Sequence, residues 1–548
     1  SALDVQTFTL SNFSMVLSDA GGNGTVRVAA LNPSGSTYTF PAGDFSSFDI
    51  GLGTTELYTT NAAAGTTYWL PQTKTTYGNL ILAPLGGSNI IFGNLSITIY
   101  GTLTAQGQNA DSWFLPTWNG AYPTAPTAVI AKTITIRGDM DIQGGGFGFY
   151  MNAAHPLQNI IVNGDVFVRN TNGAIDDWGN GNGLKSMSIG GSLINNTNGI
   201  INAPASTVSR CNFTNIPLTF FSSTNATISN TANTPTTTFG QVVINKGTSQ
   251  ATTLTCDIGG TLNTLTNNWL TFQNGTFIYA RTNPAVGQNF TISTGSFTIP
   301  ATAGLTVNMP SNSNTVRVLI GNATADASDL LLYGALNVVS GEVYVGPISG
   351  TALSNNDIEY SGNYSSVNVT GGNLYVNGQI RRPTTSTNGT LSYIQSGGTV
   401  TINGLTSVAG AATAATRAKL EIVNAGSVFN MSGSSTLTIV RGGGTTFGDL
   451  YLRPTSSTIT GGTIIFNNTV PNTTQNYTMD ANISLYNMTV TGAGVARNAT
   501  IGLSVNPLIL KGTLTFTNSN SILNANNFNV SIAGDLTNNG ASTSYVYG

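Results

Sequence analysis

The chain has 548 residues, of which 40% are hydrophobic and only 7% are charged, with 18 basic and 21 acidic side chains. A formal net charge of −3 argues against nucleic acid as a partner, because neutralising phosphates needs clustered Lys and Arg. There is no run of about 18 apolar residues, so the sequence predicts no membrane-spanning helix. The regular spacing of the hydrophobic residues predicts a folded chain and not a disordered one.

The N-terminal stretch, residues 1–75, shows weaker internal repetition than the rest of the chain. It starts without the charged and then apolar segments of a leader, which is expected of a mature secreted chain whose signal peptide has been removed. Uncovered strand edges at the end of a repeat array invite aggregation, and terminal segments commonly cover them. We therefore expect residues 1–75 to cap a repeat domain that occupies residues 76–548.

A seven-residue phrase with a central glycine recurs along the chain, and apolar residues alternate with polar ones on both sides of the glycine. This alternation predicts a strand with one buried face, and glycine permits a sharp bend because it has no Cβ. The glycines Gly138, Gly164 and Gly191 follow one another at intervals of about 26 residues, which is the spacing of a solenoid repeat. The copies are Ile97–Leu103, Ile134–Met140, Ile160–Val166, Met187–Leu193, Cys256–Leu262, Leu330–Leu336, Leu508–Leu514 and Val530–Leu536.

The second half of the chain follows the same logic. Turns that start at Leu391, Leu420 and Leu450 follow one another at intervals of about 30 residues, which predicts one coil each. The connections are too short for crossover helices, so the chain must bury its apolar residues by coiling on itself, with like residues stacked at about 4.8 Å. The sequence therefore predicts an all-β fold, a parallel β-helix (β-solenoid) with an N-terminal cap. We expect the β-helix to continue beyond Gly548.

One coil contains an insertion. The interval between Gly101 and Gly138 is about 37 residues, which predicts an additional loop at residues 111–126. Aromatic side chains on a loop stiffened by prolines can stack on sugars or on a partner protein, whereas most such loops fold back over the solenoid. Both interpretations stay open at this point. The candidate ligand-binding residues are Trp113, Phe114, Trp118 and Tyr122.

The densest acidic group of the chain lies between residues 137 and 177. Asp139 and Asp165 occupy outward positions one coil apart, which predicts carboxylates about 5 Å from each other. Like charges at that distance attract a cation or an arginine. We therefore consider a Ca²⁺ site formed by these two residues, or pairing with Arg137 or Arg169.

Catalysis is the alternative for the same acidic group. Asp139, Asp165 and Asp176 would be the acid cluster of a β-helical polysaccharide lyase or hydrolase. Asp176 and Asp177 resemble the paired acids of pectin-cleaving hydrolases, but the Gly-His-Gly and Arg-x-Lys partners of those enzymes are missing. The single histidine, His155, precedes a proline and is expected in a solvated loop. The sequence therefore predicts a protein that is not an enzyme and that needs no cofactor.

The two cysteines, Cys211 and Cys256, leave two interpretations open. Cys256 takes the first, inward position of its seven-residue phrase, which Ile97 takes in another copy, and this position predicts a buried free thiol. A disulfide between the two cysteines is the alternative.

Several phrases along the chain resemble very large secreted surface proteins of Bacteroidota, especially of the flavobacterial type. They are Leu57–Asn61, Thr67–Gln72, Tyr77–Leu82, Gln106–Asp111, Ser188–Gly199, Arg381–Pro383, Gln395–Ile402, Ala415–Glu421 and Arg441–Thr446. This resemblance covers nearly the whole chain. It implies export through the type IX secretion system and display on the outer cell surface, and some members of the family are gliding-motility adhesins. Members usually end in a C-terminal sorting domain, which these 548 residues lack.

The sequence and the resemblance together predict an extracellular structural and adhesive cell-surface protein, with a gliding-motility adhesin as its most specific form. The expected partners are surface glycans, other cells or substrata, and the outer-membrane components of type IX secretion and attachment. The alternatives are a carbohydrate-active β-helical enzyme and a passive surface filament unit.

Overall fold

The structure is a computed structural model of the 548-residue chain. It describes residues 24–30, 40–60, 63, 65–93, 95–108, 112–115, 130–149, 157–169, 173–176, 184–196, 211–230, 237–259, 262–264, 268–281, 289–309, 317–322, 328–348, 354–406, 417–443, 448–493 and 497–548, with the backbone alone at 2–6, 115 and 196.

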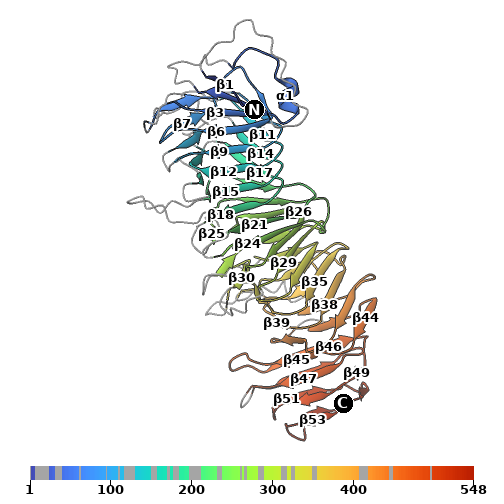
Figure 1. Cartoon of the computed structure of the whole chain (residues 1–548). Coiled ribbons are helices and arrows are strands. Elements are labelled where there is room, and N and C mark those ends of the chain that lie inside the picture. The colour runs from blue at the N-terminus through green and yellow to red at the C-terminus, as the bar shows by residue number, and fades with distance from the viewer. Residues whose placement is uncertain are drawn as a thin grey trace. The chain divides into compact units, whose positions relative to one another are not determined.

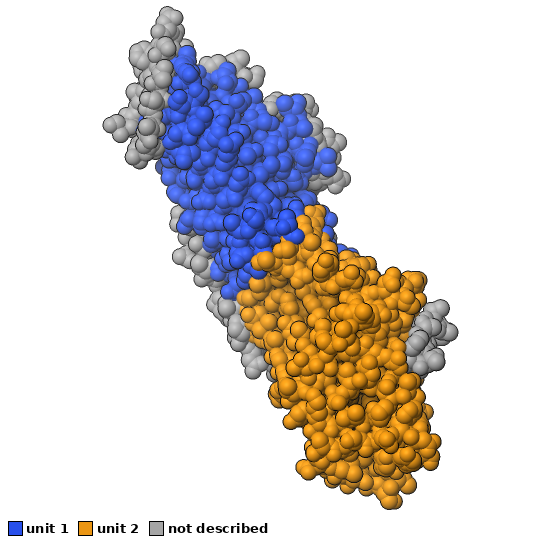
Figure 2. Space-filling model, turned by 90° about the vertical axis from the view of Figure 1, so that its right-hand side faces the viewer, with its two compact units in different colours: residues 1–248, 252–271, 282–285 blue, residues 249–251, 272–281, 286–548 orange. Residues whose placement is uncertain are grey.

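The chain forms two compact units, which are coloured separately in Figure 2. Unit 1 comprises Ser1–Thr248, Thr252–Thr271 and Thr282–Ala285, and unit 2 comprises Ser249–Ala251, Phe272–Arg281 and Val286–Gly548. Nearly all regular structure in the described residues is parallel β-strand, with one short helix, α1 (Ser46–Ile50). No helix in the described part of the chain is long and apolar enough to cross a membrane.

In unit 1 the strands stack into three parallel ladders (Figure 1), and from β3 on the chain passes through the first, second and third ladder in turn. The first ladder contains β1 (Ala2–Gln6), β2 (Thr25–Ala29), β3 (Thr54–Tyr58), β6 (Asn79–Ala83), β9 (Leu103–Gln106), β12 (Met140–Gly144), β15 (Val166–Arg169), β18 (Leu193–Asn196), β21 (Ala226–Asn230) and β24 (Thr253–Asp257). The second contains β4 (Thr67–Trp69), β7 (Asn89–Ile91), β10 (Trp113–Leu115), β13 (Gly146–Gly148), β16 (Ala174–Asp176), β19 (Cys211–Phe213), β22 (Thr237–Phe239) and β25 (Leu262–Thr264). The third contains β5 (Thr76–Tyr77), β8 (Ile97–Ile99), β11 (Lys132–Ile136), β14 (Gln158–Val162), β17 (Lys185–Ile189), β20 (Leu218–Phe220) and β23 (Val242–Asn245).

Unit 2 is built in the same way, again with three ladders. The first contains β26 (Leu270–Tyr279, in this unit from Phe272 on), β29 (Ala303–Val307), β32 (Ala335–Val338), β35 (Ser365–Val369), β38 (Leu391–Gln395), β41 (Val428–Met431) and β44 (Ser456–Ile459). The second contains β27 (Asn289–Thr291), β30 (Arg317–Ile320), β33 (Glu342–Val345), β36 (Asn373–Val376), β39 (Thr399–Ile402), β42 (Thr436–Ile439), β45 (Thr463–Asn467), β47 (Asn487–Thr491), β50 (Leu514–Phe516) and β53 (Leu536–Asn538). The third contains β28 (Phe297–Ile299), β31 (Leu330–Leu332), β34 (Ile358–Tyr360), β37 (Ile380–Arg381), β40 (Leu420–Ile422), β43 (Leu450–Leu452), β46 (Gln475–Ala481), β48 (Ala499–Leu503), β51 (Ser521–Asn524) and β54 (Tyr545–Val546). In the last coils, β49 (Leu508–Leu510) and β52 (Val530–Ile532) form a separate pair.

Inward-pointing side chains form continuous columns through the interior of unit 1. Each member pairs directly with the equivalent residue one coil away and is at most 2% exposed. Burying one such aliphatic side chain contributes about 1.5–3 kcal/mol. Two of these columns are Ile97, Ile134, Ile160 and Met187 in the third ladder and Leu103, Met140, Val166 and Leu193 in the first. These columns confirm the predicted parallel β-helix and its predicted coil length.

The corner glycine between the third and first ladders is required by close approach. The N–H of Gly164 donates to the carbonyl oxygen of Gly138 at 3.0 Å, and the N–H of Gly191 donates to that of Gly164 at 2.9 Å. A Cβ on Gly164 would lie 2.2 Å from Asp139 Oδ1 and 2.7 Å from the Gly138 carbonyl oxygen. None of these three glycines has a positive φ. The glycine therefore leaves room for the coil beneath it, which is a different reason from the bend that the sequence suggested.

Two of the predicted alignments were wrong. Cys256 pairs with Ile228 in the first ladder, so it matches the last position of the seven-residue phrase and not the first. Leu391 lies in the first ladder, whereas Leu420 and Leu450 are paired in the third, and the residue one coil before Leu420 is Ile380. The first and third ladders alternate apolar and polar residues in the same way, so only the hydrogen-bond register shows which of the two a strand joins.

The N-terminal region contributes strands to the first ladder. β2 pairs with β3 and β3 pairs with β6 over five residues each, all in parallel. The capping role of residues 1–75 stays a prediction. Both cysteines are buried thiols, which confirms the thiol predicted for Cys256, and no disulfide joins it to Cys211 in this structure.

Candidate functional site

The two aspartates of the predicted Ca²⁺ site are each bonded to the backbone of the next coil. Asp139 Oδ1 accepts a hydrogen bond from the N–H of Asp165 at 2.8 Å, and Asp165 Oδ1 accepts one from the N–H of Ser192 at 2.6 Å. Both side chains are half-buried at the corner that follows the glycine. No group of three or more His, Cys, Asp or Glu residues in the described part of the chain is placed to hold a metal ion. Both carboxylates therefore join one coil to the backbone of the next, and Ca²⁺ binding stays a prediction.

The neighbouring charges are used in other ways. Arg169 pairs with Asp141, not with Asp139 or Asp165, and its Nε lies 2.6 Å from Asp141 Oδ1. The guanidinium of Arg137 lies 4.6 Å from the centre of the Tyr100 ring, a cation–π contact. An acid–arginine pair therefore forms in this region as expected, but its acid is Asp141 and not Asp139 or Asp165.

The proposed catalytic trio is divided between ladders. Asp176 lies in β16 of the second ladder and accepts a hydrogen bond from Asn212 Nδ2 at 2.8 Å. Asp139 and Asp165 lie at the corner that leads into the first ladder. His155 and Asp177 lie outside the described residues.

The aromatic segment begins as a strand and not as a loop. Trp113–Leu115 is β10, which pairs with β7 on one side and β13 on the other. Phe114 is fully buried and is paired with Ile90 and Phe147. Trp113 faces outward and is half-buried, since its ring fills the space where Gly146 would carry a Cβ. Phe114 is thus a core residue, and Trp118 and Tyr122 lie outside the described residues.

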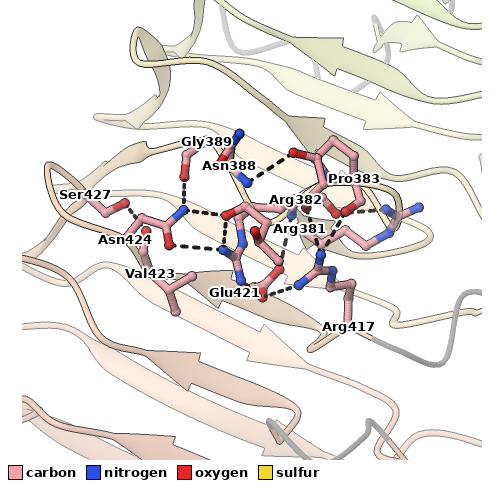
Figure 3. Close-up of polar contacts among 12 residues, drawn as sticks. Arg381, Arg382, Pro383, Asn388, Gly389, Arg417, Glu421, Val423, Asn424 and Ser427 are labelled. Atoms are coloured by element: carbon pink, nitrogen blue, oxygen red, sulfur yellow. Dashed lines mark hydrogen bonds and ion pairs between the residues drawn. The ribbon is translucent and has the colours of Figure 1, made fainter.

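Unit 2 contains a buried charged cluster that sequence reasoning missed. We call it the arginine–carboxylate network, and Figure 3 shows part of it. All of its members except Glu359 are at most 6% exposed, which is unusual in a chain with so few charges. Its members come from the third ladder and the segments that flank it, and are Asp357, Glu359, Arg381, Arg382, Arg417 and Glu421.

Every charge in this network has a partner of opposite sign. Arg381 lies 2.7 Å from Asp357 and 3.0 Å from Glu359. Glu421 receives Arg382 at 2.7 Å and Arg417 at 3.4 Å (Figure 3). Buried ion pairs persist when good geometry repays the cost of removing the charges from water. The network therefore links coils that are 22 to 39 residues apart in sequence.

Arg417 of the network and Asn424 beside it hold the segment that follows Pro383. Arg417 Nη2 donates to the carbonyl oxygens of Pro383 at 3.0 Å and Ser386 at 2.8 Å. Asn424 Nδ2 donates to the carbonyl oxygens of Thr387 and Gly389, each at 2.8 Å (Figure 3). Side-chain donors here replace the regular backbone ladder, so residues 383–389 are fixed against the coil above them.

One carboxyl near the network has a strongly shifted pKa. Burial raises the pKa of Asp329 to about 7, and the negative charge of Asp357 adds to this effect. Burial also raises the pKa of Asp357, against the opposing influence of Arg381. Asp329 Oδ1 accepts the N–H of Asp357 at 2.8 Å, a bond of the same kind as that between Asp139 and Asp165, but at the corner that leads into the third ladder. A shifted pKa in a buried structural position identifies a pH-sensitive corner.

A sequence signal for this network did exist. Arg381 and Arg382 are adjacent, and Arg417, Lys419 and Glu421 follow within one coil, in a chain where only 7% of residues are charged. Local concentration of charge in such a chain marks a place where charges must pair. The pairing itself depends on the coil length between the two segments, which composition does not reveal.

Comparison with known proteins adds no relative. No protein-family model, no curated protein and no solved structure matches the chain.

Proposed function

We propose that this protein is a structural and adhesive component of an outer cell surface, in which the β-helix of each unit carries mechanical load. The observation that supports this most directly is the parallel pairing from coil to coil in register, as between β11, β14 and β17. Aspartate bonds at the corners reinforce junctions between coils in unit 1, and buried ion pairs reinforce others in unit 2. Side-chain contacts therefore add to the backbone pairing at several of the junctions between coils.

The composition supports exposure to an aqueous exterior with little charge. Hydroxyl and amide side chains cover the outward positions of many strands, for example the half-buried Thr399, Thr401 and Thr436 in β39 and β42. Export through the type IX secretion system, display on the cell surface, and glycans or other cells as partners belong to this proposal. A role in gliding is its most specific form, and these points rest on the sequence resemblance.

Pulling a single molecule by its two ends tests the mechanical part. If coils are the units of resistance, unfolding proceeds in steps of one coil, and each step releases roughly 90 Å of chain. One all-or-none event for the whole chain, or extension without resistance, would contradict the proposal.

Adhesion is tested separately. Beads coated with the folded chain should adhere to cells or to glycan-coated surfaces, and beads coated with the heat-unfolded chain should not. Stepwise mechanical resistance without any adhesion would leave a passive filament as the function.

A further inference from the structure

A buried lysine–aspartate pair lies between α1 and β5 in unit 1, and sequence reasoning did not single it out. Asp49 belongs to α1, and Lys74 lies just before β5, which contacts that helix. Lys74 Nζ lies 2.6 Å from Asp49 Oδ2, and the two side chains are 7% and 2% exposed. The ion pairs of the arginine–carboxylate network use guanidinium groups, which stay charged, whereas a buried lysine can become a neutral amine.

Aromatic rings surround the ammonium group of this pair. Lys74 Nζ lies 4.8 Å from the centre of the Phe40 ring and 5.1 Å from the centres of the Phe45 and Tyr77 rings. Phe40 and Phe45 pack edge to face with their centres 5.0 Å apart, and all three aromatic side chains are at most 9% exposed. Burial lowers the pKa of Lys74 and raises the pKa of Asp49, against the opposing influence of each group on the other. Both shifts favour the transfer of a proton from Nζ to Oδ2.

The two carboxylate oxygens of Asp49 are in different environments. Its Oδ2 accepts hydrogen bonds from Lys74 Nζ and from Thr76 Oγ1 at 3.0 Å. Its Oδ1 is buried and accepts no hydrogen bond of normal geometry, and the N–H of Gly78 makes only the weakest of the polar interactions of this carboxyl. A buried oxygen without a donor is less unfavourable when it belongs to a neutral amide than when it belongs to a charged carboxylate.

We propose that Lys74 and Asp49 join in an intramolecular amide, an isopeptide bond. A proton passes from Nζ to Oδ2, which leaves a neutral amine beside a carboxylic acid. The lone pair of Nζ then attacks Cγ, and the tetrahedral intermediate transfers a second amine proton to Oδ2. The Nζ–Cγ bond forms, the Cγ–Oδ2 bond breaks, and Oδ2 leaves as one molecule of water. Oδ1 becomes the amide carbonyl oxygen, and nothing is oxidised or reduced.

Proximity favours this condensation over the reverse hydrolysis. Well-oriented groups within one molecule react at effective concentrations of about 10⁵–10⁸ M, far above the concentration of water itself. The fold holds Nζ at contact distance from Oδ2 and buries both groups. The amide also removes two buried charges, which are expensive to keep away from water. This inference goes beyond the proposed function and does not depend on it.

Mass spectrometry of the folded 548-residue chain tests the bond. We expect the intact mass to be lower than the mass of the sequence by one molecule of water. Trypsin should fail to cleave the unfolded chain after Lys74, because the amine that it recognises is acylated. Chymotrypsin cleaves between the two residues, for example after Tyr68, and should leave a branched peptide that contains both Asp49 and Lys74.

Lys246 is the matched internal control. It is buried as well, but its Nζ donates to the carbonyl oxygens of Gly190 at 2.7 Å and Phe221 at 2.6 Å, which belong to the backbone and not to a carboxyl group. Trypsin should therefore cleave the unfolded chain completely after Lys246 and not after Lys74.

Two variants separate the bond from the ion pair. Lys74→Arg keeps a positive charge beside Asp49 but has no nucleophilic amine, and Asp49→Ala has no carboxyl group to attack. Both variants should keep the full mass of their sequences. Three results would overturn the inference. They are a folded chain with the full mass of the sequence, cleavage after Lys74 as complete as after Lys246, and a loss of water that persists in both variants.

Discussion

At the corner between the third and first ladders of unit 1, two residues in successive coils depend on each other. Asp139 Oδ1 accepts a hydrogen bond from the N–H of Asp165 in the next coil. The same oxygen occupies the space beside Gly164 that a Cβ would need. The corner therefore needs both an acceptor in one coil and a missing side chain in the next. Asp165 and Gly191 repeat the arrangement one coil further on.

This dependence predicts that Gly164→Ala destabilises unit 1. The new Cβ would lie 2.2 Å from Asp139 Oδ1 and 2.7 Å from the Gly138 carbonyl oxygen, so the backbone must shift. We expect a loss of about 1–3 kcal/mol in the free energy of unfolding, as for other overpacked sites. Urea denaturation measures it. Gly295→Ala is the control, since a Cβ there meets nothing within 4 Å, and an equal loss in both variants would refute the steric explanation.

Asp329 predicts a pH dependence in unit 2. Its pKa is raised from 3.8 to about 7 in the folded chain, mainly by burial, so the folded chain binds this proton more tightly than the unfolded chain. Its stabilising contribution is present below pH 3.8 and is lost as the pH rises to about 7. Asp329→Asn keeps an acceptor for the Asp357 N–H and should flatten the fall in unfolding free energy between pH 4 and 7.

Chemical denaturation at a series of pH values gives the slope of the unfolding free energy against pH for each variant. Asp535→Asn, at an exposed position on the last coil, serves as the control. Identical slopes in the unmodified chain and in Asp329→Asn would show that Asp329 does not titrate in this range.

At the level of elements, buried charge joins coils in unit 2 in addition to the columns of hydrophobic side chains. Glu421 in β40 accepts Arg382, which directly follows β37 on the coil before, and Arg417. Such a network adds stability only while it is complete, because a buried charge without its partner is strongly unfavourable. Removing one charge of this network should therefore lower the free energy of unfolding more than removing one charge of an exposed ion pair.

We expect Glu421→Gln to lower the free energy of unfolding of unit 2 by about 3–5 kcal/mol, because Arg382 and Arg417 would lose their shared counter-charge. Glu56→Gln is the matched control. It breaks the Arg27–Glu56 pair, whose side chains are 38% and 21% exposed, and should cost about 1 kcal/mol or less. Equal costs in the two variants would contradict the structural importance of burial in the network.

At the level of the molecule, each unit is a stack in which a coil contacts mainly its two neighbours. The columns of unit 1 show this, because Met140 pairs with Leu103 on one side and Val166 on the other. Stability in such a stack is approximately a sum over coils and the interfaces between them. A whole coil is then the smallest piece that can be removed without disturbing the register of the rest.

Deleting residues 139–164 tests this, because it joins Gly138 directly to Asp165 and removes one whole coil. The strands β9 and β15 would then pair as β9 and β12 do now. We expect the shortened chain to keep its β-sheet circular dichroism and the hydrogen-exchange protection of β9 and β15. Deletion of residues 139–151, half a coil, should abolish that protection, and equal behaviour of the two deletions would contradict the coil as the unit.

Local alternation was sufficient to predict strands, their inward residues and the coil length in unit 1. Ile134, Ile136 and Ile160 are buried as the sequence indicates, because side chains of a strand point alternately to its two sides whatever surrounds it. The same alternation failed to assign Cys256 and Leu391 to their ladders, since the first and third ladders share it.

Contacts between coils were decided only in three dimensions. Glu421 meets Arg382 across 39 residues, and Asp49 meets Lys74 across 25, so each pairing depends on the summed lengths of the strands and corners between them. The local pattern of apolar and polar residues does not reveal the summed length of these strands and corners. The sequence therefore determined a coiled all-β chain with an apolar interior, while the stacking of coils placed Asp139 beneath a glycine and closed the arginine–carboxylate network.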